Sequence, residues 1–364
     1  MKKIRTWMAV LACMLLAVSG AQASGVTLRT FTPFADMDFA AQGYMDMITR
    51  WETETGNLVE DYSGILDGLF MENLQTMLSE GTADVVVLPV GAGLPEGMLV
   101  TADELIAGTD CGARKMDAMA EKDGSVLLVP VRLYWEALYV NTDVLAQYGL
   151  DVPQTFEQLL AACAALAQNG VLPIANALND WNEIVLDCAA LMGAGDAAYA
   201  DQASLSGAQE VLEALVQVKA FGGDPWSLTD AEAEQKFLSG EAAMRFDADV
   251  LAQMVEEARW DNVVVVNPPL GDGQTRGEVV GVPAFGAAIT RACWSDSARS
   301  EAAVSFLMSL LEEKSLVAPV GGKLGDSIAA LTAGATDMTG VLYDHHPDSF
   351  DSWAEGVIAK LMGK

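Results

Sequence analysis

The sequence predicts an α/β fold divided into two lobes, each with a mostly parallel sheet flanked by helices. The chain has 364 residues, which is enough for two domains of roughly 150 residues each. Strand-like and helix-like segments alternate from residue 26 to residue 88, and this rhythm is typical of a parallel sheet covered by helices. A second series of strands and helices begins near residue 126, which places a second lobe after the first.

In the first lobe, three strand-like segments are separated by two amphipathic helices. Residues 26–31 alternate in the strand period, 58–62 form the next strand, and 84–88 are an apolar run typical of a strand buried on both faces. The intervening helices carry apolar residues at helical spacing and stop at glycine, with Gly56 ending the first and Gly81 the second.

In the second region, strands are expected at 126–130, 138–141, 263–266 and, as extended structure, 279–289. Helices are expected from 142, at 155–169, and at 181–192, 204–220, 230–239 and 296–312. Thr155 is placed to cap the N-terminus of its helix, because Gln158 follows three residues later.

The N-terminus has the three regions of a secretory signal peptide. A basic start is followed by an apolar run from Trp7 to Val18 and by the small-residue site Ala21-Gln22-Ala23. We therefore expect residues 1–23 to be removed and the protein to act outside the cytoplasm, in the periplasm or its equivalent. Lipid attachment at Cys13 is a disfavoured variant, because the mature chain would then begin with an apolar stretch. No later segment is apolar enough to span a membrane.

The charge balance is strongly acidic. The chain has 51 acidic and 20 basic residues, for a net charge of −31, and loss of Lys2, Lys3 and Arg5 with the signal makes it three units more negative. Such a surface repels nucleic acid and anionic lipid, so we expect neither as a partner. An acidic solvated surface explains the composition, and it also mildly favours cationic ligands.

No metal or cofactor is expected. Cys111, Cys163, Cys188 and Cys293 follow neither metal-site nor CxxC spacing. We interpret them as buried thiols, with one disulfide left open because the protein is exported. The histidines are limited to the adjacent pair His345 and His346.

Six short sequence motifs follow one another in a fixed order along the chain. They are 138–150 (LYVNTDVLAQYGL), 152–159 (VPQTFEQL), 170–175 (GVLPIA), 237–244 (FLSGEAAM), 265–270 (VVNPPL) and 281–289 (GVPAFGAAI). In this order the chain resembles the family 1 extracellular solute-binding proteins of bacterial ABC importers, the maltose-binding-protein type, over roughly residues 26–320. Only about 40 residues follow Val320, which is short for this family.

The resemblance implies the two-lobed periplasmic-binding-protein fold, with strands crossing near 131–136 and 280–287 and the ligand in a cleft between the lobes. The expected domains are 24–132 with 283–325, then 133–282, then a helical tail at 326–364. The implied partners are a small polar solute and the ABC permease subunits in the membrane, and we expect a monomer.

Carbohydrate ligands need flat aromatic faces and fixed hydrogen-bonding groups at strand ends. The resemblance puts Trp181, beside Asp180, in the family's aromatic ligand loop, Asp247 after its AAM word, and Trp353 where longer relatives bring a C-terminal aromatic residue. The other candidates follow strands or lie at the first crossing: Asp36, Asp61, Tyr62, Tyr134 and Trp135. Tyr134 shares one strand face with Glu136, and Trp135 points to the opposite face.

We therefore interpret the chain as a non-catalytic binding component of an importer, most consistent with a carbohydrate ligand. Two alternatives stay open: the same fold binding a polyamine or another cation through its carboxylates, and a secreted glycan hydrolase. The sequence contains no Gly-x-Ser-x-Gly, His-Glu-x-x-His or Walker motif. A sensor subunit of the same fold is a further reading.

Overall fold

A computed structural model describes most of the chain, in ten stretches. These are residues 25–36, 40–90, 97–109, 128–178, 183–194, 205–224, 226–269, 281–312, 320–332 and 350–361. The expected signal peptide, Cys13, Cys111 and the two histidines lie outside the described residues. In the described part, no helix is long and apolar enough to cross a membrane.

The chain forms two compact units, each made from separate stretches of sequence. Unit 1 is Met1–Arg114, Leu127–Val129 and Ala287–Leu316, and unit 2 is Lys115–Val126, Pro130–Gly286 and Val317–Lys364. Two of these divisions fall inside strands, because β4 spans Val129–Asn141 and β8 spans Gly281–Ile289. The α/β class and the two units agree with the sequence-based prediction.

Unit 1 has a parallel sheet in which β1 (Thr27–Phe31) lies between β2 (Leu58–Asp61) and β3 (Val85–Pro89). Thr30 pairs with Asp61 on one side and with Val85 on the other, so the carboxyl ends of these strands lie at one edge. The helical elements of unit 1 are η1 (Phe34–Asp36), α2 (Ala41–Thr55), α3 (Phe70–Glu80), α4 (Ala102–Gly108), α11 (Arg291–Trp294) and α12 (Ser297–Glu312).

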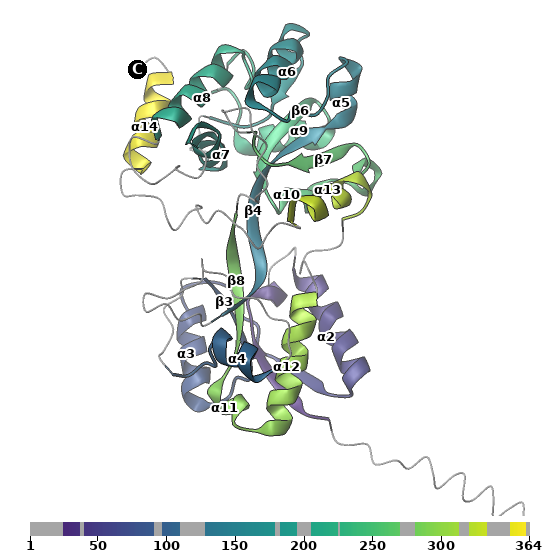
Figure 1. Ribbon diagram of the computed structural model, residues 1–364, viewed down its shortest axis with the longest axis vertical. Coiled ribbons are helices and arrows are strands. Elements are labelled where there is room, and N and C mark those ends of the chain that lie inside the picture. Colours follow the sequence, from purple (N-terminus) through teal and green to yellow (C-terminus); the bar gives the residue numbers. More distant parts are fainter. Residues whose placement is uncertain are drawn as a thin grey trace, which may run out of the picture. The chain divides into compact units, whose positions relative to one another are not determined.

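The core of unit 1 joins segments that are far apart in the sequence. Helix α2 buries Tyr44, Met47, Ile48 and Trp51, as their spacing predicts, and ends at Gly56, whose φ of 72° a side chain would strain. The Trp51 ring meets Phe306 of α12 edge to face at 5.3 Å, which brings α2 and α12 together (Figure 1). This explains how residues after the second crossing return to complete unit 1.

The sheet of unit 2 is mixed, which corrects the expectation of a mostly parallel sheet. Strand β4 pairs antiparallel with both β6 (Ala242–Ala248) and β7 (Val263–Val266), whereas β5 (Leu172–Ile174) runs parallel to β6. The order of strands and helices predicts the elements but not the direction of β4, which is one continuous strand where two shorter ones were expected.

Nine helical elements of unit 2 are described. They are α5 (Thr142–Gln147), α6 (Phe156–Gln168), α7 (Glu183–Ala194), α8 (Leu205–Gln217), α9 (Asp230–Ser239), α10 (Leu251–Met254), η4 (Glu257–Arg259), α13 (Gly322–Thr332) and α14 (Phe350–Leu361). The predicted Thr155 cap is confirmed, since its Oγ1 accepts a hydrogen bond from the Gln158 amide at 3.3 Å.

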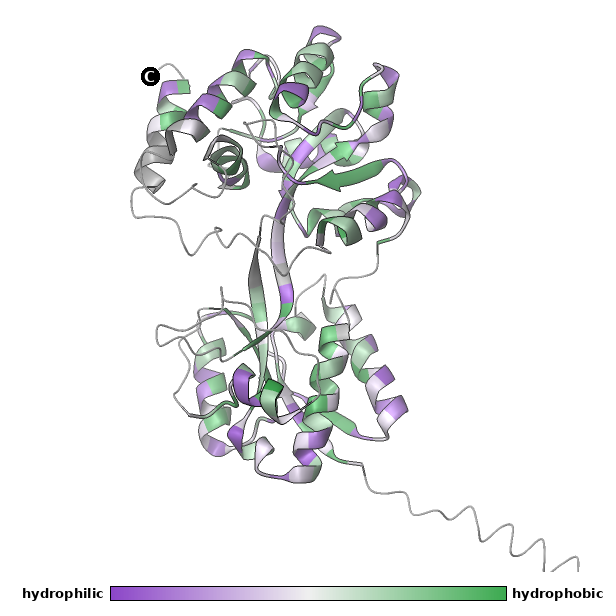
Figure 2. Ribbon diagram, viewed as in Figure 1, coloured by the Kyte–Doolittle hydropathy of each residue, from purple (hydrophilic) through white to green (hydrophobic). Residues whose placement is uncertain are grey.

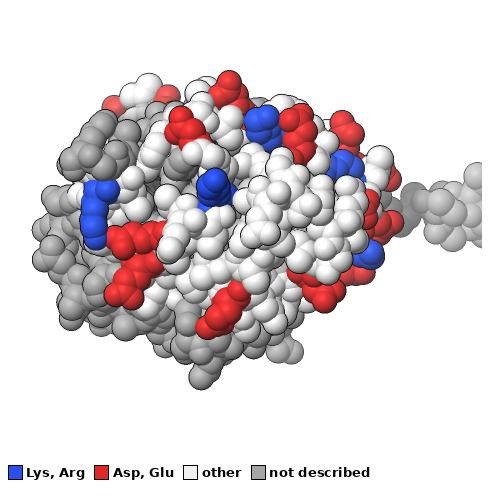
Figure 3. Space-filling view, turned by 90° about the horizontal axis from the view of Figure 1, so that it is seen from above, with Lys and Arg blue, Asp and Glu red and all other residues white. Residues whose placement is uncertain are grey.

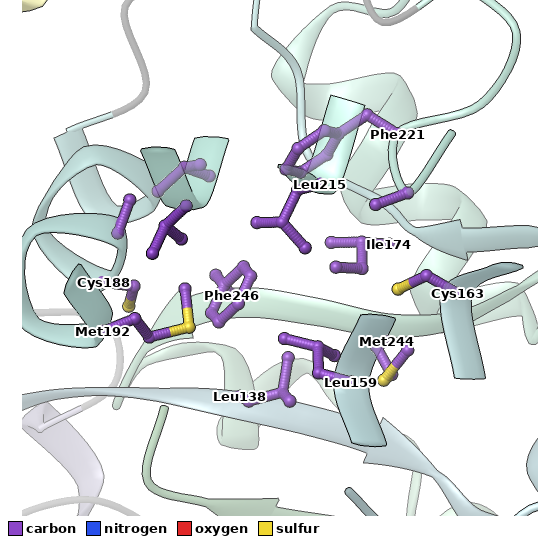
Figure 4. Packing of buried hydrophobic residues seen from close by; sticks show 14 of the residues in the cluster. Leu138, Leu159, Cys163, Ile174, Cys188, Met192, Leu215, Phe221, Met244 and Phe246 are labelled. Carbon is purple, nitrogen blue, oxygen red and sulfur yellow. The ribbon is translucent and has the colours of Figure 1, made fainter. Parts of the chain in front are cut away.

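Two hydrophobic cores lie against the faces of this sheet. The first contains Leu138, Ile174, Met244 and Phe246 with helices α6, α7 and α8 (Figure 4). The second contains Trp135, Tyr139 and Phe237, together with Leu324 of α13. Val357 of α14 is buried in the first core. The C-terminal helices therefore belong to unit 2, and the expected domain limit at residue 325 falls inside α13.

The prediction of buried thiols is confirmed for the three cysteines that are described. Cys163, Cys188 and Cys293 are free and buried. Cys163 and Cys188 contribute their sulfur atoms to the first core of unit 2 (Figure 4), where they act as small apolar side chains.

Candidate functional site

The sequence-predicted ligand residues divide into described and undescribed positions. Asp180 and Trp181 lie outside the described residues. Asp36 ends η1 and Trp353 lies in α14, and for these two the structure describes the backbone alone. The five remaining candidates are Asp61 and Tyr62 in unit 1 and Tyr134, Trp135 and Asp247 in unit 2.

In unit 1, the carboxyl edge of the sheet presents Tyr62 to solvent. Tyr62 follows β2 directly and is 44% exposed. Asp61, one residue earlier, turns inward: its Oδ1 accepts hydrogen bonds from Thr30 Oγ1 at 2.7 Å and Tyr44 Oη at 2.8 Å. These bonds hold the buried Tyr44 hydroxyl, so Asp61 has a structural task that its position in the sequence did not indicate.

Three further apolar side chains are exposed in the segment that joins β2 to α3. Ile65, Leu66 and Leu69 are 66%, 46% and 59% exposed. The sequence analysis did not predict that these side chains are exposed. A signal was present, because they lie in a loop with Ser63, Gly64, Asp67 and Gly68. Tyr62 and these three side chains thus form an exposed apolar group at the carboxyl edge of the sheet.

In unit 2, the first half of β4 carries polar side chains in place of core residues. Arg132, Tyr134 and Glu136 alternate along the strand and therefore share one face. The Tyr134 hydroxyl donates a hydrogen bond to Glu136 Oε1 at 3.1 Å. Arg132 Nη2 donates to Asp249 Oδ2 at 2.7 Å. These contacts bring β4 together with the end of β6, where Asp249 follows.

Trp135 points to the other face, as period two predicts, and it belongs to the core. It is 6% exposed and its ring stacks on Tyr139 with centroids 6.1 Å apart. Trp135 is thus a packed core residue behind the polar face, and its contact with a ligand stays a prediction.

Asp247 is also engaged inside the protein. It accepts hydrogen bonds from Arg245 Nε and from the Ala248 amide. Arg245 in turn donates to Ala175 O at 2.9 Å and to Asp230 Oδ1 at 3.0 Å. Both Asp247 oxygens thus have internal donors, which gives this side chain a structural role, and its contact with a ligand stays a prediction.

Carboxylate groups are the main charges near the polar face of β4. Burial raises the pKa of the Asp249 carboxyl above its ordinary value, and the Arg132 guanidinium opposes that rise. Burial, followed by the carboxylates of Glu136, Asp249 and Asp187, raises the pKa of the Tyr134 hydroxyl. Tyr134 therefore keeps its proton at physiological pH and acts as a hydrogen-bonding group.

Asp187 and Arg132 are members of this cluster that sequence reasoning missed. Asp187 is 1% exposed and interrupts α7, a helix that is otherwise hydrophobic almost throughout (Figure 2). A single aspartate inside an apolar helix is a usable sequence signal, because a buried charge requires partners. Arg132 could likewise have been predicted, because it lies two residues before Tyr134 and therefore on the same strand face as Tyr134 and Glu136.

A pocket of about 330 Å³ lies elsewhere on unit 2. Its walls are mostly apolar and include Pro153, Val266, Pro268, Pro269 and Leu331. None of the candidate ligand residues lines it, so we do not assign the ligand to this pocket. Among the described residues, no group of three or more His, Cys, Asp or Glu could hold a metal ion.

The charged surface of unit 2 agrees with the acidic composition. On the face seen in Figure 3, lysine and arginine side chains lie singly, with acidic side chains near them. The described part of this face has no continuous basic patch of the kind that nucleic acid requires.

Comparison with known proteins gives one curated relative at modest similarity. The chain is 24% identical over 202 residues to a probable sugar-binding periplasmic protein of Rhizobium meliloti, and the match covers 49% of this chain and 47% of that protein. The chain thus aligns with about half the length of this relative.

Solved structures share the fold over nearly the whole chain. A probable secreted solute-binding lipoprotein from Streptomyces coelicolor is 17% identical with a TM-score of 0.68, and the match covers 94% of this chain and 99% of that one. The bacterial solute receptor AcbH, described with an exclusive preference for β-D-galactopyranose, is 15% identical with a TM-score of 0.63, covering 94% and 96%.

The sequence profile of one family matches most of the chain. The matched residues are 48–338, and the family is described as bacterial extracellular solute-binding protein. This range includes most of unit 1 and the whole polar face of β4. The chain therefore belongs to the bacterial extracellular solute-binding protein family.

Proposed function

We propose that this chain is the substrate-binding component of an ABC importer, that it acts outside the cytoplasm after loss of an N-terminal signal, and that it binds a carbohydrate. It hands the ligand to permease subunits in the membrane, works as a monomer and performs no catalysis. Family membership supports the binding role, and the sugar-binding curated relative favours a carbohydrate.

The observation that carries the ligand class is the polar face of β4. Tyr134 is a partly buried aromatic side chain, and it lies beside carboxylates of Glu136 and Asp249 that are 2% and 7% exposed. Aromatic faces stack on sugar rings and carboxylate oxygens accept hydrogen bonds from hydroxyl groups. The exposed Tyr62 of unit 1 offers a second aromatic surface of the same kind.

Calorimetric titration tests the proposal with D-galactose, xylobiose, maltose and chitobiose, and with putrescine as the cationic alternative. Binding of at least one sugar, with a rise in melting temperature and without product formation, is the expected result. Binding of putrescine alone would replace the carbohydrate with a cation, and release of shorter sugars from an oligosaccharide would make the protein a hydrolase.

A further inference from the structure

The pocket of unit 2 forms where helix α13 packs against strand β7. Its walls come from residues in three stretches of the chain, 153–154, 265–269 and 327–331. Helix α13 lies beside β7 (Figure 1), and all three stretches belong to unit 2. The cavity is therefore built within one compact unit and needs no residue of the other.

The pocket has a buried inner wall and an exposed mouth. Pro153, Pro268 and Pro269 are buried, whereas Gln154 and Ala330 are exposed. The volume of about 330 Å³ lies near the lower limit of small-molecule sites, which is roughly 300 Å³. A compound of one or two rings is therefore the size that this pocket accommodates.

Hydrogen bonds hold the walls in place before any ligand binds. The Val265 amide donates to Ser327 Oγ at 3.0 Å, and this hydroxyl donates to Leu324 O at 2.8 Å. The Leu324 amide donates in turn to Trp260 O at 2.9 Å, which fixes the start of α13. Proline also fixes the backbone angle φ at three wall positions. Little conformational freedom remains to be lost on binding, and this favours affinity.

The lining favours a neutral occupant. None of the described residues that line the pocket is charged, although charged residues make up 20% of the chain. The Ser327 hydroxyl already accepts and donates within the protein. A charged group in the pocket would therefore lose hydration without gaining a matching partner.

The prolines favour an aromatic ring over a saturated one. The C–H groups beside a proline nitrogen carry partial positive charge, and the face of an aromatic ring is negative. Domains that bind proline-rich segments use the same contact with the roles exchanged, since their grooves are lined with aromatic side chains. The three prolines therefore offer surfaces on which an aromatic ring packs well.

We infer that this pocket is a second ligand site, which binds a neutral compound with one or two aromatic rings, of the phenol or indole class, separately from the carbohydrate. None of the described candidate residues for the carbohydrate lines the pocket. This second site therefore exists whether or not the protein binds a sugar.

NMR titration of the unaltered protein with indole tests the site directly. The side-chain amide signal of Gln154, at the mouth, should shift with a dissociation constant of about 1 mM or tighter. In about 0.5 M sodium chloride, which screens the general charge of the protein, tryptamine and indole-3-acetate should each bind at least about 10-fold more weakly than indole. Phenol should bind about 2- to 10-fold more tightly than cyclohexanol. A missing shift at Gln154, or equal affinities within either comparison, overturns the inference.

Two variants of α13 give a matched comparison. Ala329 and Ala330 are adjacent exposed residues, and of the two only Ala330 lines the pocket. Ala330→Phe should place a ring in the mouth and weaken indole binding at least about 10-fold, whereas Ala329→Phe should bind indole as the unaltered protein does. Equal indole affinity in the two variants overturns the inference. The melting temperatures of the ligand-free variants report folding, and the titrations of the unaltered protein decide the matter if Ala330→Phe does not fold.

A competition experiment separates this site from the carbohydrate site. Indole should stay bound when a sugar that binds the protein is added to saturation, and displacement of indole by the sugar overturns the assignment of a second site. If no sugar binds, the proposed function fails, and the indole titration alone decides this inference.

Discussion

Gly193 of α7 and Gly207 of α8 touch backbone to backbone, and a Cβ on Gly193 would overlap the carbonyl group of Gly207. The absence of a Cβ on either residue lets the backbones of the two helices touch in unit 2, where α7 supplies Asp187 to the polar face. Neither residue needs a left-handed conformation, so the requirement for glycine comes from space alone.

Gly193→Ala should therefore destabilise unit 2 by about 1–3 kcal/mol, the usual effect of forcing extra atoms into a packed contact. Urea unfolding gives the free energy directly. Gly223→Ala is the matched control, because a Cβ there meets nothing within 4 Å. Equal stability of the two variants would show that the helices adjust without cost.

Arg245 and its two carboxylates should respond unequally to mutation. Arg245→Leu leaves Asp247 buried without its ion-pair partner and should cost about 3–5 kcal/mol of unfolding free energy. Asp230→Asn should cost no more than about 1 kcal/mol, because the Asp230 side chain is 51% exposed. Chemical denaturation of both variants measures the difference, and a larger loss from Asp230→Asn would contradict this account of the network.

Asp61 and Tyr62 are adjacent in the chain but should have opposite mutational effects. Asp61→Ala removes the acceptor of the buried Tyr44 hydroxyl and should lower stability by about 1–3 kcal/mol, with little effect on sugar affinity. Tyr62→Ala should weaken sugar binding and leave the melting temperature nearly unchanged. Calorimetry and thermal unfolding of both proteins separate the two roles, and a stable Asp61→Ala protein with impaired binding would return Asp61 to the ligand.

The buried thiol of Cys163 should make stability depend on alkaline pH. Burial raises its pKa from 9.0 to about 12, so between these values the folded protein retains a proton that the unfolded chain loses. The free energy of unfolding should therefore fall as pH rises above 9, by up to about 1.4 kcal/mol per pH unit from this group.

Urea unfolding at pH 8.5, 9.5 and 10.5 measures that slope, and Cys163→Ala should make it shallower. The comparison uses slopes because removal of the sulfur also leaves a small cavity that lowers stability at every pH. The same slope in both proteins would mean that Cys163 does not control the effect.

The sequence predicted the elements of the fold well where their signals are local. The strands of unit 1, the glycine stop at Gly56, the Thr155 cap and the burial of Cys163 all follow from nearby residues. The direction of β4 did not, because strand pairing depends on partners more than 100 residues away. The placement of α13 and α14 in unit 2 depends on equally distant packing.

For the candidate site, residue type and strand period predicted positions for ligand contact, but they could not predict which side chains have hydrogen-bond partners inside the protein. Tyr134 and Tyr62 were predicted from their positions, whereas Asp61, Trp135 and Asp247 proved to be held inside the protein. The carboxylates of Asp61 and Asp247 each accept hydrogen bonds from groups inside the protein. Some of these donors are remote in the sequence, as Tyr44 is for Asp61, and others lie at a neighbouring position of the strand. Such donors cannot be assigned before the fold is known.

The burial of Val357 and Leu324 in the cores of unit 2 has a consequence for biosynthesis. A nascent chain cannot finish either core until almost its entire length has left the ribosome, and unit 1 likewise waits for Phe306 of α12. Completion of both units is thereby delayed to the end of translation. Until then the chain stays incompletely folded, which is the state in which a polypeptide can pass through a secretion channel.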